Sequence, residues 1–513
     1  MRRTTRTARA AMATTSALAA LAALSACTDA GTTSGSSGKA GGGKDTLTLG
    51  MSQDIQGWDI TAQPSYQGWA SSAVYDNLLR CDAEGKPQPG AAKSWTFKPD
   101  NTGATIKLRP GMKFTDGAPV DSAAVKTAIE YSKTHGGGAN RYKAMKVSTP
   151  DDLTVVITTD KPNPVLTARL CDVRLASPKY LASGKTNKEP VGSGPYRLDK
   201  SATTNGSVYA FVKRKDYWDS KSFPYKRLRV KVITNETAAI NALKTDQLDG
   251  SLITQATYSQ AKSAGLKIQS KVNGVARLLL TDHQGKKIPA LGNRDVRRAM
   301  NMVFDKDAMA KNLYRGLAEP TAQIFRSGSS AYLEGLKDPY PYDVKAAKKL
   351  MAKAGYSKGF SLEIPFMQGQ NIDSLMPVVK QQLGLLTIKV KQKNLSGPNA
   401  ITELLSGKYP VPMWMLGNYG DSRLDMADYV LPDGIWNVMH EKDPKIAGLW
   451  NKIQTETPAE SVKDQQAVNK YLIDQAWFVP LAATRTFYAY SPKVRIQPST
   501  DPAGLHPMLW DFK

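Results

Sequence analysis

The N-terminal segment constrains this chain most, because it decides the environment in which the rest must fold. Arg2, Arg3, Arg6 and Arg9 form a positively charged stretch, and residues 10–24 consist of Ala, Leu, Ser, Thr and Met. A run of this length is too short to span a bilayer stably, but it suits the apolar part of a secretory signal peptide. We therefore expect the chain to fold outside the cytoplasm.

Residues 24–27 read LSAC, in which a Leu and two small residues precede Cys27. The pattern resembles the lipobox of bacterial lipoproteins, whose Cys is acylated and becomes the first residue of the mature protein. The residues that follow are rich in Gly, Ser and Thr and contain no apolar side chain larger than Ala, which predicts a flexible tether. An ordinary signal peptide with a chance Cys is the alternative, but the tether favours the lipid. We predict a signal peptide over residues 1–26 and a tether over residues 27–44.

No later stretch approaches the roughly 18 apolar residues that a membrane-crossing helix needs. We therefore expect lipid alone to hold the body of the chain at the membrane. One acyl chain binds a bilayer only marginally, whereas the diacylglyceryl group of bacterial lipoproteins anchors stably. The predicted location is the extracytoplasmic face of the cell membrane.

Length and composition indicate a globular protein with two or three domains. A chain of 513 residues is too long for one hydrophobic core, and its 41% apolar and 8% aromatic content argues against disorder. The net charge of +24 comes from dispersed Lys and Arg, without the basic stripe or motif of a nucleic-acid-binding protein. The charge indicates either attraction to anionic membrane and wall polymers or a well-solvated surface.

Two cysteines remain once Cys27 is assigned to the lipid. Cys81 and Cys171 are expected outside the cytoplasm, where thiols commonly pair. Two buried free thiols that behave as small hydrophobes are the alternative. We favour a disulfide between Cys81 and Cys171.

Hydrophobic periodicity predicts strands and helices that intermix along the chain. Apolar residues alternate, as in half-buried strands, over residues 46–52, 152–158, 227–233 and 387–391. A helix is expected to begin after Asp121, a candidate N-cap. The clearest helix begins at Asp343, also a candidate N-cap, and ends at Gly355, which can adopt the left-handed conformation that terminates a helix. The chain is therefore predicted to be a mixed α/β protein.

Several short segments form an ordered series of motifs. They are YDNLL and PGAAKSW (75–79 and 89–95), IKLRPGMKFTDGAPV (106–120), PVGSGPY (190–196), KDYW (215–218), LKTDQLDG (243–250), DVRRA (295–299), AAKKLMAKAGY (346–356) and FVPL (478–481). In this order they resemble the solute-binding proteins of peptide and nickel importers, known as solute-binding family 5. The most specific match is the segment 106–120, which is close to the family signature "F-LR-GVKFHDG-P-".

This resemblance implies a two-lobed α/β fold of the periplasmic-binding-protein type (type II, cluster C), with a hinge and an inserted subdomain. Transferred to this chain, the boundaries are 45–74, 190–272 and 492–513 for lobe I, 75–189 for the inserted subdomain and 273–491 for lobe II. The two lobes of such a protein close on the solute, and the closed shape is what the transporter recognises.

The resemblance also implies a function. We expect a monomeric, membrane-anchored binding protein of an ABC importer that captures a short peptide and delivers it to the permease and ATPase subunits. Relatives bind metal chelates or oligosaccharides on the same scaffold, so another solute is an alternative, as is a surface receptor that senses peptides. No nucleic-acid partner is expected.

An enzyme would be a function of a different class. His135, His283, His440 and His506 are isolated, and the chain contains no HExxH, GxSxG or CxxC motif and no P-loop. No His, Asp or Glu cluster has the spacing of metal ligands. We expect no catalytic residues, no bare metal ion and no cofactor, and a secreted hydrolase that uses carboxylates is the alternative.

The candidate site follows from the resemblance. Residues 413–428 read MWMLGNYGDSRLDMAD and occupy the place of the family's "GW-ADY-DP", whose Asp receives the ammonium group of a peptide. The best match is Asp421, preceded by Asn418 and Tyr419, and the second choice is Asp425. Asp421 in the role of a turn or cap after a strand is the alternative.

Two aromatic residues complete the predicted site. Trp414 lies in the same segment, and Trp58 lies shortly after the first predicted strand. A sugar ligand would need aromatic platforms of this kind, and Trp436 is a third candidate for that purpose.

Overall fold

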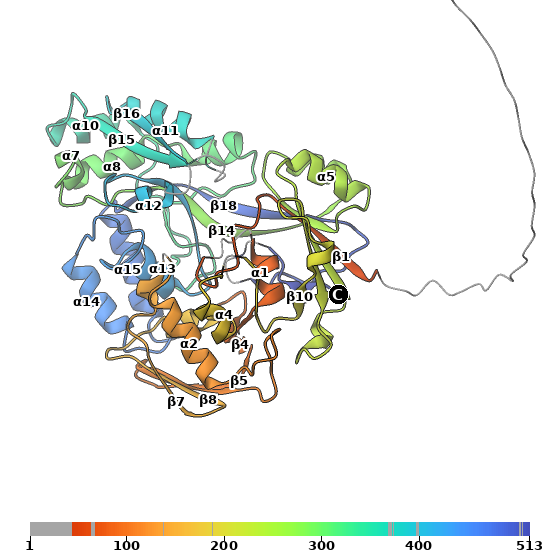
Figure 1. The fold of residues 1–513 in the computed structure, drawn as a ribbon. Helices are drawn as coiled ribbons and strands as arrows, with labels where there is room; N and C mark the ends of the chain where they lie inside the picture. The colour runs from red at the N-terminus through yellow and green to blue at the C-terminus, as the bar shows by residue number, and fades with distance from the viewer. Residues whose placement is uncertain are drawn as a thin grey trace, which may run out of the picture. The chain divides into compact units, whose positions relative to one another are not determined.

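Two 13-residue strands, β14 (Lys267–Leu279) and β18 (Phe478–Tyr490), pair antiparallel and connect the main parts of the protein (Figure 1). They belong to a computed structural model that describes residues 44–62, 67–136, 138–186, 188–367, 372, 374–396, 400–501, 504 and 506–513. The predicted signal peptide, Cys27 and nearly all of the predicted tether lie outside these residues. Within the described part of the chain, no helix is long and apolar enough to cross a membrane.

An eight-stranded sheet forms around this pair in the order β10-β11-β12-β1-β13-β18-β14-β17. Its other strands are β1 (Thr46–Met51), β10 (Tyr196–Leu198), β11 (Val208–Lys213), β12 (Arg227–Val232), β13 (Gly250–Ile253) and β17 (Met413–Gly417). Strand β1 runs parallel to β12 and β13 and is buried on both faces from Leu47 onward, rather than on one face as predicted. A strand inside a sheet with parallel neighbours is commonly covered on both sides.

Residues 76–182 form a separate antiparallel sheet in the order β5-β6-β8-β7. Its strands are β5 (Ala92–Phe97), β6 (Gly103–Leu108), β7 (Lys146–Asp151) and β8 (Thr154–Thr158). Helix α2 (Ser122–Ser132) contacts this sheet, and the Asp121 side chain caps it by accepting the amide hydrogen of Ala124, as predicted. The same region contains β2 (Asp76–Asn77), β3 (Leu79–Cys81), β4 (Pro87–Pro89), η2 (Ala139–Arg141), α3 (Leu166–Cys171), β9 (Arg174–Leu175) and α4 (Pro178–Ala182).

Residues 280–477, between β14 and β18, are mainly helical. The helices include α8 (Arg294–Met302), α10 (Val344–Lys353), α11 (Leu375–Gly384), α12 (Ala400–Leu404), α13 (Ser422–Tyr429), α14 (Pro444–Ile453) and α15 (Val462–Asp474). A parallel strand pair, β15 (Ser361–Met367) and β16 (Lys389–Leu395), lies beside α10 and α11 in Figure 1. Asp343 caps α10 through the amide hydrogen of Ala346, and Gly355 follows with φ +83°, as the sequence predicted.

The hydrophobic interior is divided among several clusters. The largest joins β1 and α1 (Gly68–Val74) with the 76–182 region, whereas two others lie within the 280–477 region and against β14 and β18. A smaller cluster packs α5 (Glu236–Lys244) against the opposite ends of the same two strands. Both strands therefore pass from one part of the interior to another, and their pairing is irregular at Val272/Gly274 and Ala276/Arg277.

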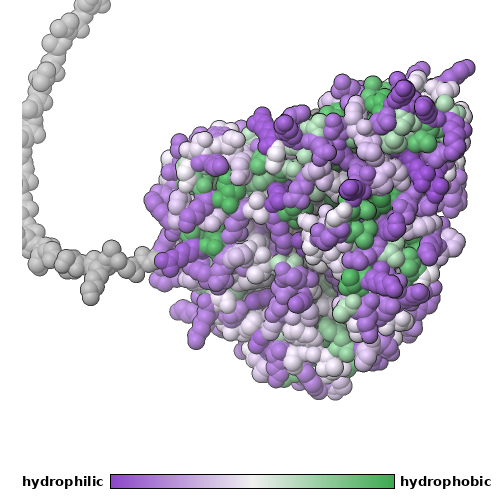
Figure 2. All heavy atoms as spheres, turned by 180° about the vertical axis from the view of Figure 1, so that it is seen from behind, coloured by the Kyte–Doolittle hydropathy of each residue, from purple (hydrophilic) through white to green (hydrophobic). Residues whose placement is uncertain are grey.

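The surface carries few large apolar residues. Among the described residues only Leu336, Tyr342 and Ile401 are large, hydrophobic and exposed. Figure 2 shows that hydrophilic residues cover most of the face opposite to Figure 1, with hydrophobic residues in separate small patches. The mixed α/β prediction is confirmed, while the predicted domain boundaries stay predictions.

Candidate functional site

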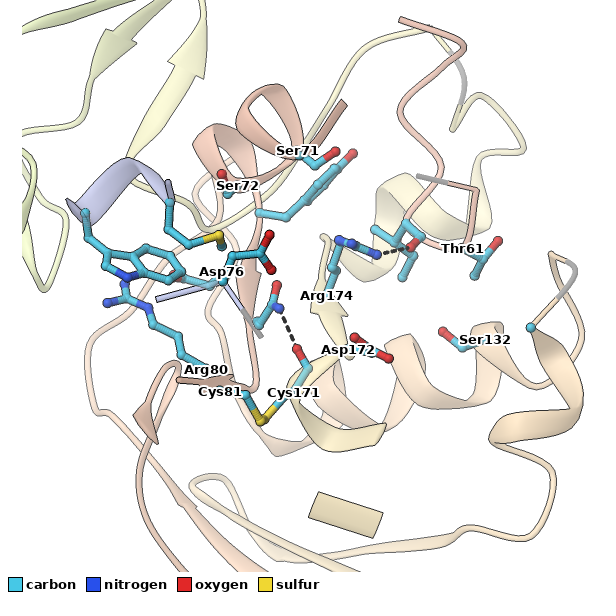
Figure 3. Close-up of a pocket in the computed structure, with 18 of the residues that line it drawn as sticks. Thr61, Ser71, Ser72, Asp76, Arg80, Cys81, Ser132, Cys171, Asp172 and Arg174 are labelled. Atoms are coloured by element: carbon cyan, nitrogen blue, oxygen red, sulfur yellow. Dashed lines mark hydrogen bonds between the residues drawn. A yellow bond between two sulfur atoms is a disulfide. The ribbon is translucent and has the colours of Figure 1, made fainter. Parts of the chain in front are cut away.

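A cavity of about 410 Å³ lies where the 76–182 region meets α1, the C-terminal segment and Tyr419 of the loop after β17 (Figure 3). Its walls contain carboxylates, guanidinium groups and tyrosine hydroxyls from distant parts of the chain. They are Asp76, Asp172 and Asp501, then Arg80, Arg141 and Arg174, then Tyr75, Tyr142, Tyr217 and Tyr419. The volume lies within the usual range for small-molecule sites.

At one end of the cavity, Arg80 is held by groups of the protein itself. Its guanidinium donates to Asp219 Oδ2 and to the Tyr217 hydroxyl, each at 2.9 Å, and lies 4.5 Å from the centre of the Trp510 ring. Tyr217 in turn donates to Asp76 Oδ1 at 2.7 Å. Burial raises the pKa of Asp76 above its ordinary value. This end is therefore an internal polar network packed against aromatic rings.

At the other end of the cavity, charged side chains form fewer hydrogen bonds with the protein. Asp172 is exposed, and none of the described residues forms a hydrogen bond or ion pair with its side chain. Arg174 donates one bond of 3.3 Å to the carbonyl of Ile60. Figure 3 shows Asp172 and Arg174 among the side chains around the cavity. A carboxylate and a guanidinium therefore face the same small space.

Arg141 and two tyrosines complete this end. Arg141 Nη2 donates to Asp428 Oδ2 at 2.8 Å, and its side chain remains 27% exposed. Burial raises the pKa of Tyr142 and of Tyr419 to about 12, so both hydroxyls stay protonated at neutral pH and can donate.

Cys81 and Cys171 are joined by a disulfide with a Cα–Cα distance of 5.7 Å. This is the pairing that the sequence analysis favoured. The bridge ties the end of β3 to the end of α3 and lines the cavity. It therefore holds Arg80 and Asp172, each adjacent to one of the cysteines, in one wall.

A second cavity of about 1,100 Å³ separates the 76–182 region from the 280–477 region. Its lining includes many apolar side chains, among them Val165, Ile401, Leu431, Ile446 and Trp450. Gly138 and Arg141 border both cavities, so the two spaces are neighbours.

The segment 413–428, predicted as the site, forms β17, a short loop and α13. Asp421 is the N-cap of α13, accepting the amide hydrogen of Arg423 at 2.9 Å and pairing with the Arg423 guanidinium at 2.7 Å. This is the capping role that the sequence analysis named as the alternative, and the Asp421 carboxylate does not line either cavity.

Asp425, the second choice, is completely buried. Its carboxylate accepts the amide hydrogen of Tyr419 and a hydrogen of the Asn418 side chain, each at 3.0 Å. Burial raises its pKa to about 8. Asn418 also donates to the Ile324 carbonyl at 3.1 Å. Asp425 and Asn418 therefore set the shape of the loop that carries Tyr419 to the cavity wall.

The predicted tryptophans lie in the interior. Trp414 packs on Trp436 with ring centres 5.4 Å apart, and Trp58 contacts Tyr209 and Phe211 edge-on. Of the six predicted ligand residues, Tyr419 alone is among the described residues that line the first cavity.

No motif in the sequence pointed to Arg141, Asp172, Arg174 or Asp428. A usable signal was the segment 169–174, RLCDVR, which carries three charges around Cys171. Among the described residues, no three His, Cys, Asp or Glu are placed to hold a metal ion.

Comparisons with known proteins agree on the family. The model of "Bacterial extracellular solute-binding proteins, family 5 Middle" matches residues 86–433. The glutathione-binding protein GsiB of Escherichia coli K12 is 24% identical over 446 residues, which cover 82% of this chain and 85% of GsiB.

Solved structures show the same fold. DppA from Helicobacter pylori in complex with the peptide STSA has a TM-score of 0.78 and 20% identity, covering 91% of this chain and 97% of DppA. AgaA from A. tumefaciens R10 in complex with agropinic acid has a TM-score of 0.79 and 23% identity, covering 91% of this chain and 98% of AgaA. The predicted two-lobed periplasmic-binding-protein fold is confirmed.

Proposed function

Because the chain belongs to family 5 of the bacterial extracellular solute-binding proteins, we propose that it captures a short peptide outside the cell membrane and delivers it to an ABC importer. The relatives support this choice of solute, since GsiB is named for glutathione, a tripeptide, and DppA was solved with the peptide STSA. The complex of AgaA with agropinic acid shows that the fold alone does not decide the ligand.

The proposal rests on side chains of opposite charge that lie at one end of the first cavity. The Asp172 carboxylate is exposed and unpaired among the described residues, while Arg141 and Arg174 border the same space. A short peptide with free ends is a zwitterion. Its ammonium group would pair with Asp172, and its carboxylate would pair with one of the arginines. Charge-assisted hydrogen bonds of this kind are about twice as strong as neutral ones.

Asp421 and Asp425, which the sequence suggested for the ammonium group, already have partners in the protein. A carboxylate that is already engaged gains less from an incoming ammonium group than a free one does. We therefore place the ammonium contact at Asp172 and keep Tyr419 as a contact from the opposite wall of the cavity.

The location of the protein is part of the proposal. The lipobox-like residues 24–27 and the Gly-rich segment after them support a lipid anchor on Cys27, and permease and ATPase subunits would be the partners. A Cys27→Ala variant is expected to lose the lipid mass on its N-terminal peptide and to leave the membrane fraction. Wild-type protein found free in the medium without lipid would contradict the anchor.

The peptide assignment can be tested by calorimetry with four ligands: tri-alanine, N-acetyl-tri-alanine, tri-alanine amide and a neutral disaccharide. We expect tri-alanine to bind and both blocked forms to bind more weakly, because each lacks one charge. Native mass spectrometry of freshly purified protein would identify a retained cellular ligand. A retained sugar or metal chelate, together with no binding of tri-alanine, would overturn the peptide assignment.

A further inference from the structure

Asp428, near the end of α13, binds two arginines from the 76–182 region. Its Oδ2 accepts from Arg141 Nη2 and its Oδ1 accepts from Arg169 Nη2, both at 2.8 Å. The Asp428 and Arg169 side chains are each 5% exposed, and that of Arg141 is 27% exposed. We call these three residues the Asp428 clasp.

The clasp joins two parts of the protein with separate interiors. Leu170, next to Arg169, belongs to the cluster around β1 and the 76–182 sheet, whereas Met426 and Tyr429 belong to a cluster of the 280–477 region. Within the described part of the chain, every ion pair between the 76–182 and 280–477 regions involves Asp428. Both regions contribute lining residues to the two cavities, and we call them the two walls. The clasp is therefore the main charged contact between these walls.

Hydrogen bonds to backbone carbonyls cross the same boundary. Asn101 Nδ2 donates to the Gln454 carbonyl at 3.0 Å, and Arg326 donates to the Ala83 carbonyl at 3.3 Å. Single bonds to carbonyls are worth less than a carboxylate that binds two guanidinium groups. Asp428 therefore makes the strongest polar contacts between the two regions.

The charges within the clasp do not balance. One carboxylate faces two guanidinium groups, and Arg169 Nη1 is buried without a hydrogen-bond partner among the described residues. Bringing such groups out of water is costly unless their charges are compensated. Arg141 also borders the first cavity, so an anionic group placed there would supply the missing negative charge.

We propose that Asp428 is a positioning residue that holds the two walls together and presents Arg141 to the carboxylate end of the solute. The part concerning the solute depends on the proposed function, whereas the closure itself does not. When the walls separate, the three charged groups are hydrated. When they close, Asp428 holds Arg141 at the cavity, and the solute's carboxylate completes the charge balance while Asp172 takes the ammonium group. The solute thereby favours the closed arrangement that retains it.

Closure can be measured without a ligand. Lys98 is exposed in the turn that carries Asn101, and Thr455 is exposed beside Gln454. With Lys98→Cys and Thr455→Cys in the full chain, a short bismaleimide should cross-link the two positions when the walls close, and peptide mass spectrometry would quantify the product. We expect Asp428→Asn in this background to slow cross-linking by about tenfold.

The matched control is Asp338→Asn, which removes a carboxylate paired with the buried Lys306 at 2.6 Å inside the 280–477 region. It should leave the cross-linking rate unchanged even if the melting temperature falls. An unchanged rate in Asp428→Asn would overturn the proposal and reduce Asp428 to a local structural role. If Asp428→Asn does not fold, Arg141→Gln gives the same test, because that side chain is partly exposed.

The proposed effect of Asp428 on retention of the solute is tested by a separate measurement. Stopped-flow dissociation of tri-alanine should be about tenfold faster from Asp428→Asn than from wild type, with a smaller change in the association rate. Equal dissociation rates would refute the coupling to the solute. If the wild type does not bind tri-alanine, the proposed function fails, and the cross-linking rates still decide whether the clasp closes the walls.

Discussion

The two ends of the first cavity contain similar residues but use them differently. At the Arg80 end, the guanidinium is bound to Asp219, Tyr217 and the Trp510 ring. At the Asp172 end, the carboxylate is exposed and has no partner among the described residues. Residue type alone therefore does not separate a side chain that the protein already engages from one that is free to meet a solute. Among the carboxylates, we therefore propose Asp172 as the ligand contact because no group of the described residues pairs with it.

The disulfide joins these two ends, so its removal should have the largest effect. A variant with Cys81→Ala and Cys171→Ala should lose roughly 4–5 kcal/mol in free energy of unfolding, because the bridge closes a loop with a sequence separation of 90. Urea unfolding monitored by circular dichroism would measure this loss. Two free thiols at these positions in the denatured, unreduced wild type would show that the bridge is absent and remove the basis of the prediction.

Substituting one carboxylate at each end of the cavity tests whether the two ends differ in ligand binding. Asp172→Asn should weaken binding of tri-alanine by about 2 kcal/mol, because the ammonium group loses its charged partner. Asp76→Asn should change thermal stability and leave the affinity nearly unchanged, since Asp76 is buried in the Arg80 network. Calorimetry on both variants gives the answer. A larger loss of affinity in Asp76→Asn would reverse the roles of the two ends.

Asp425 offers a test through pH. Burial raises its pKa in the folded protein to about 8, above the ordinary value of 3.8. Between these two values the folded state keeps a proton that the unfolded state loses, so this residue should make stability fall as pH rises from about 4 to about 8. Hydrogen bonds from Tyr419 and Asn418 lower this pKa and burial raises it, and burial has the larger effect.

The measurement is the free energy of unfolding at pH 5 and pH 8 for wild type and Asp425→Asn, which cannot ionise. The decrease between the two pH values should be smaller in the variant. An identical decrease in both proteins would show that Asp425 does not titrate in this range. Since the Tyr419 loop depends on Asp425, affinity for tri-alanine should be recorded at the same two pH values.

Local patterns predicted the fold well where the cause was local. Asp121 and Asp343 cap their helices, and Gly355 takes a left-handed conformation, because each depends on neighbouring backbone groups alone. The strand predicted from residue 387 begins instead at Lys389. Thr387 has φ +61°, which is incompatible with a strand, and hydrophobic alternation carries no signal for that conformation.

The candidate site was harder to predict because its groups come from distant segments. Arg141, Asp172 and Tyr419 meet only after the 76–182 sheet and β17 are in place. The family motif directed attention to residues 413–428, and Tyr419 does line the cavity there. Whether Asp421 was free or paired depended on the rotamer of Arg423, two residues away, which no motif specifies.

The smallest effect is expected for Asp421→Asn, the variant that the family motif would have ranked first. Asn caps helices about as well as Asp, so α13 should keep its N-terminus. The lost ion pair with Arg423 joins residues only two apart and should cost little. We expect the affinity for tri-alanine to change by less than about 0.5 kcal/mol. If calorimetry instead shows a loss as large as that of Asp172→Asn, Asp421 must exchange Arg423 for the peptide's ammonium group on binding. The distinction between paired and free carboxylates would then fail in this protein.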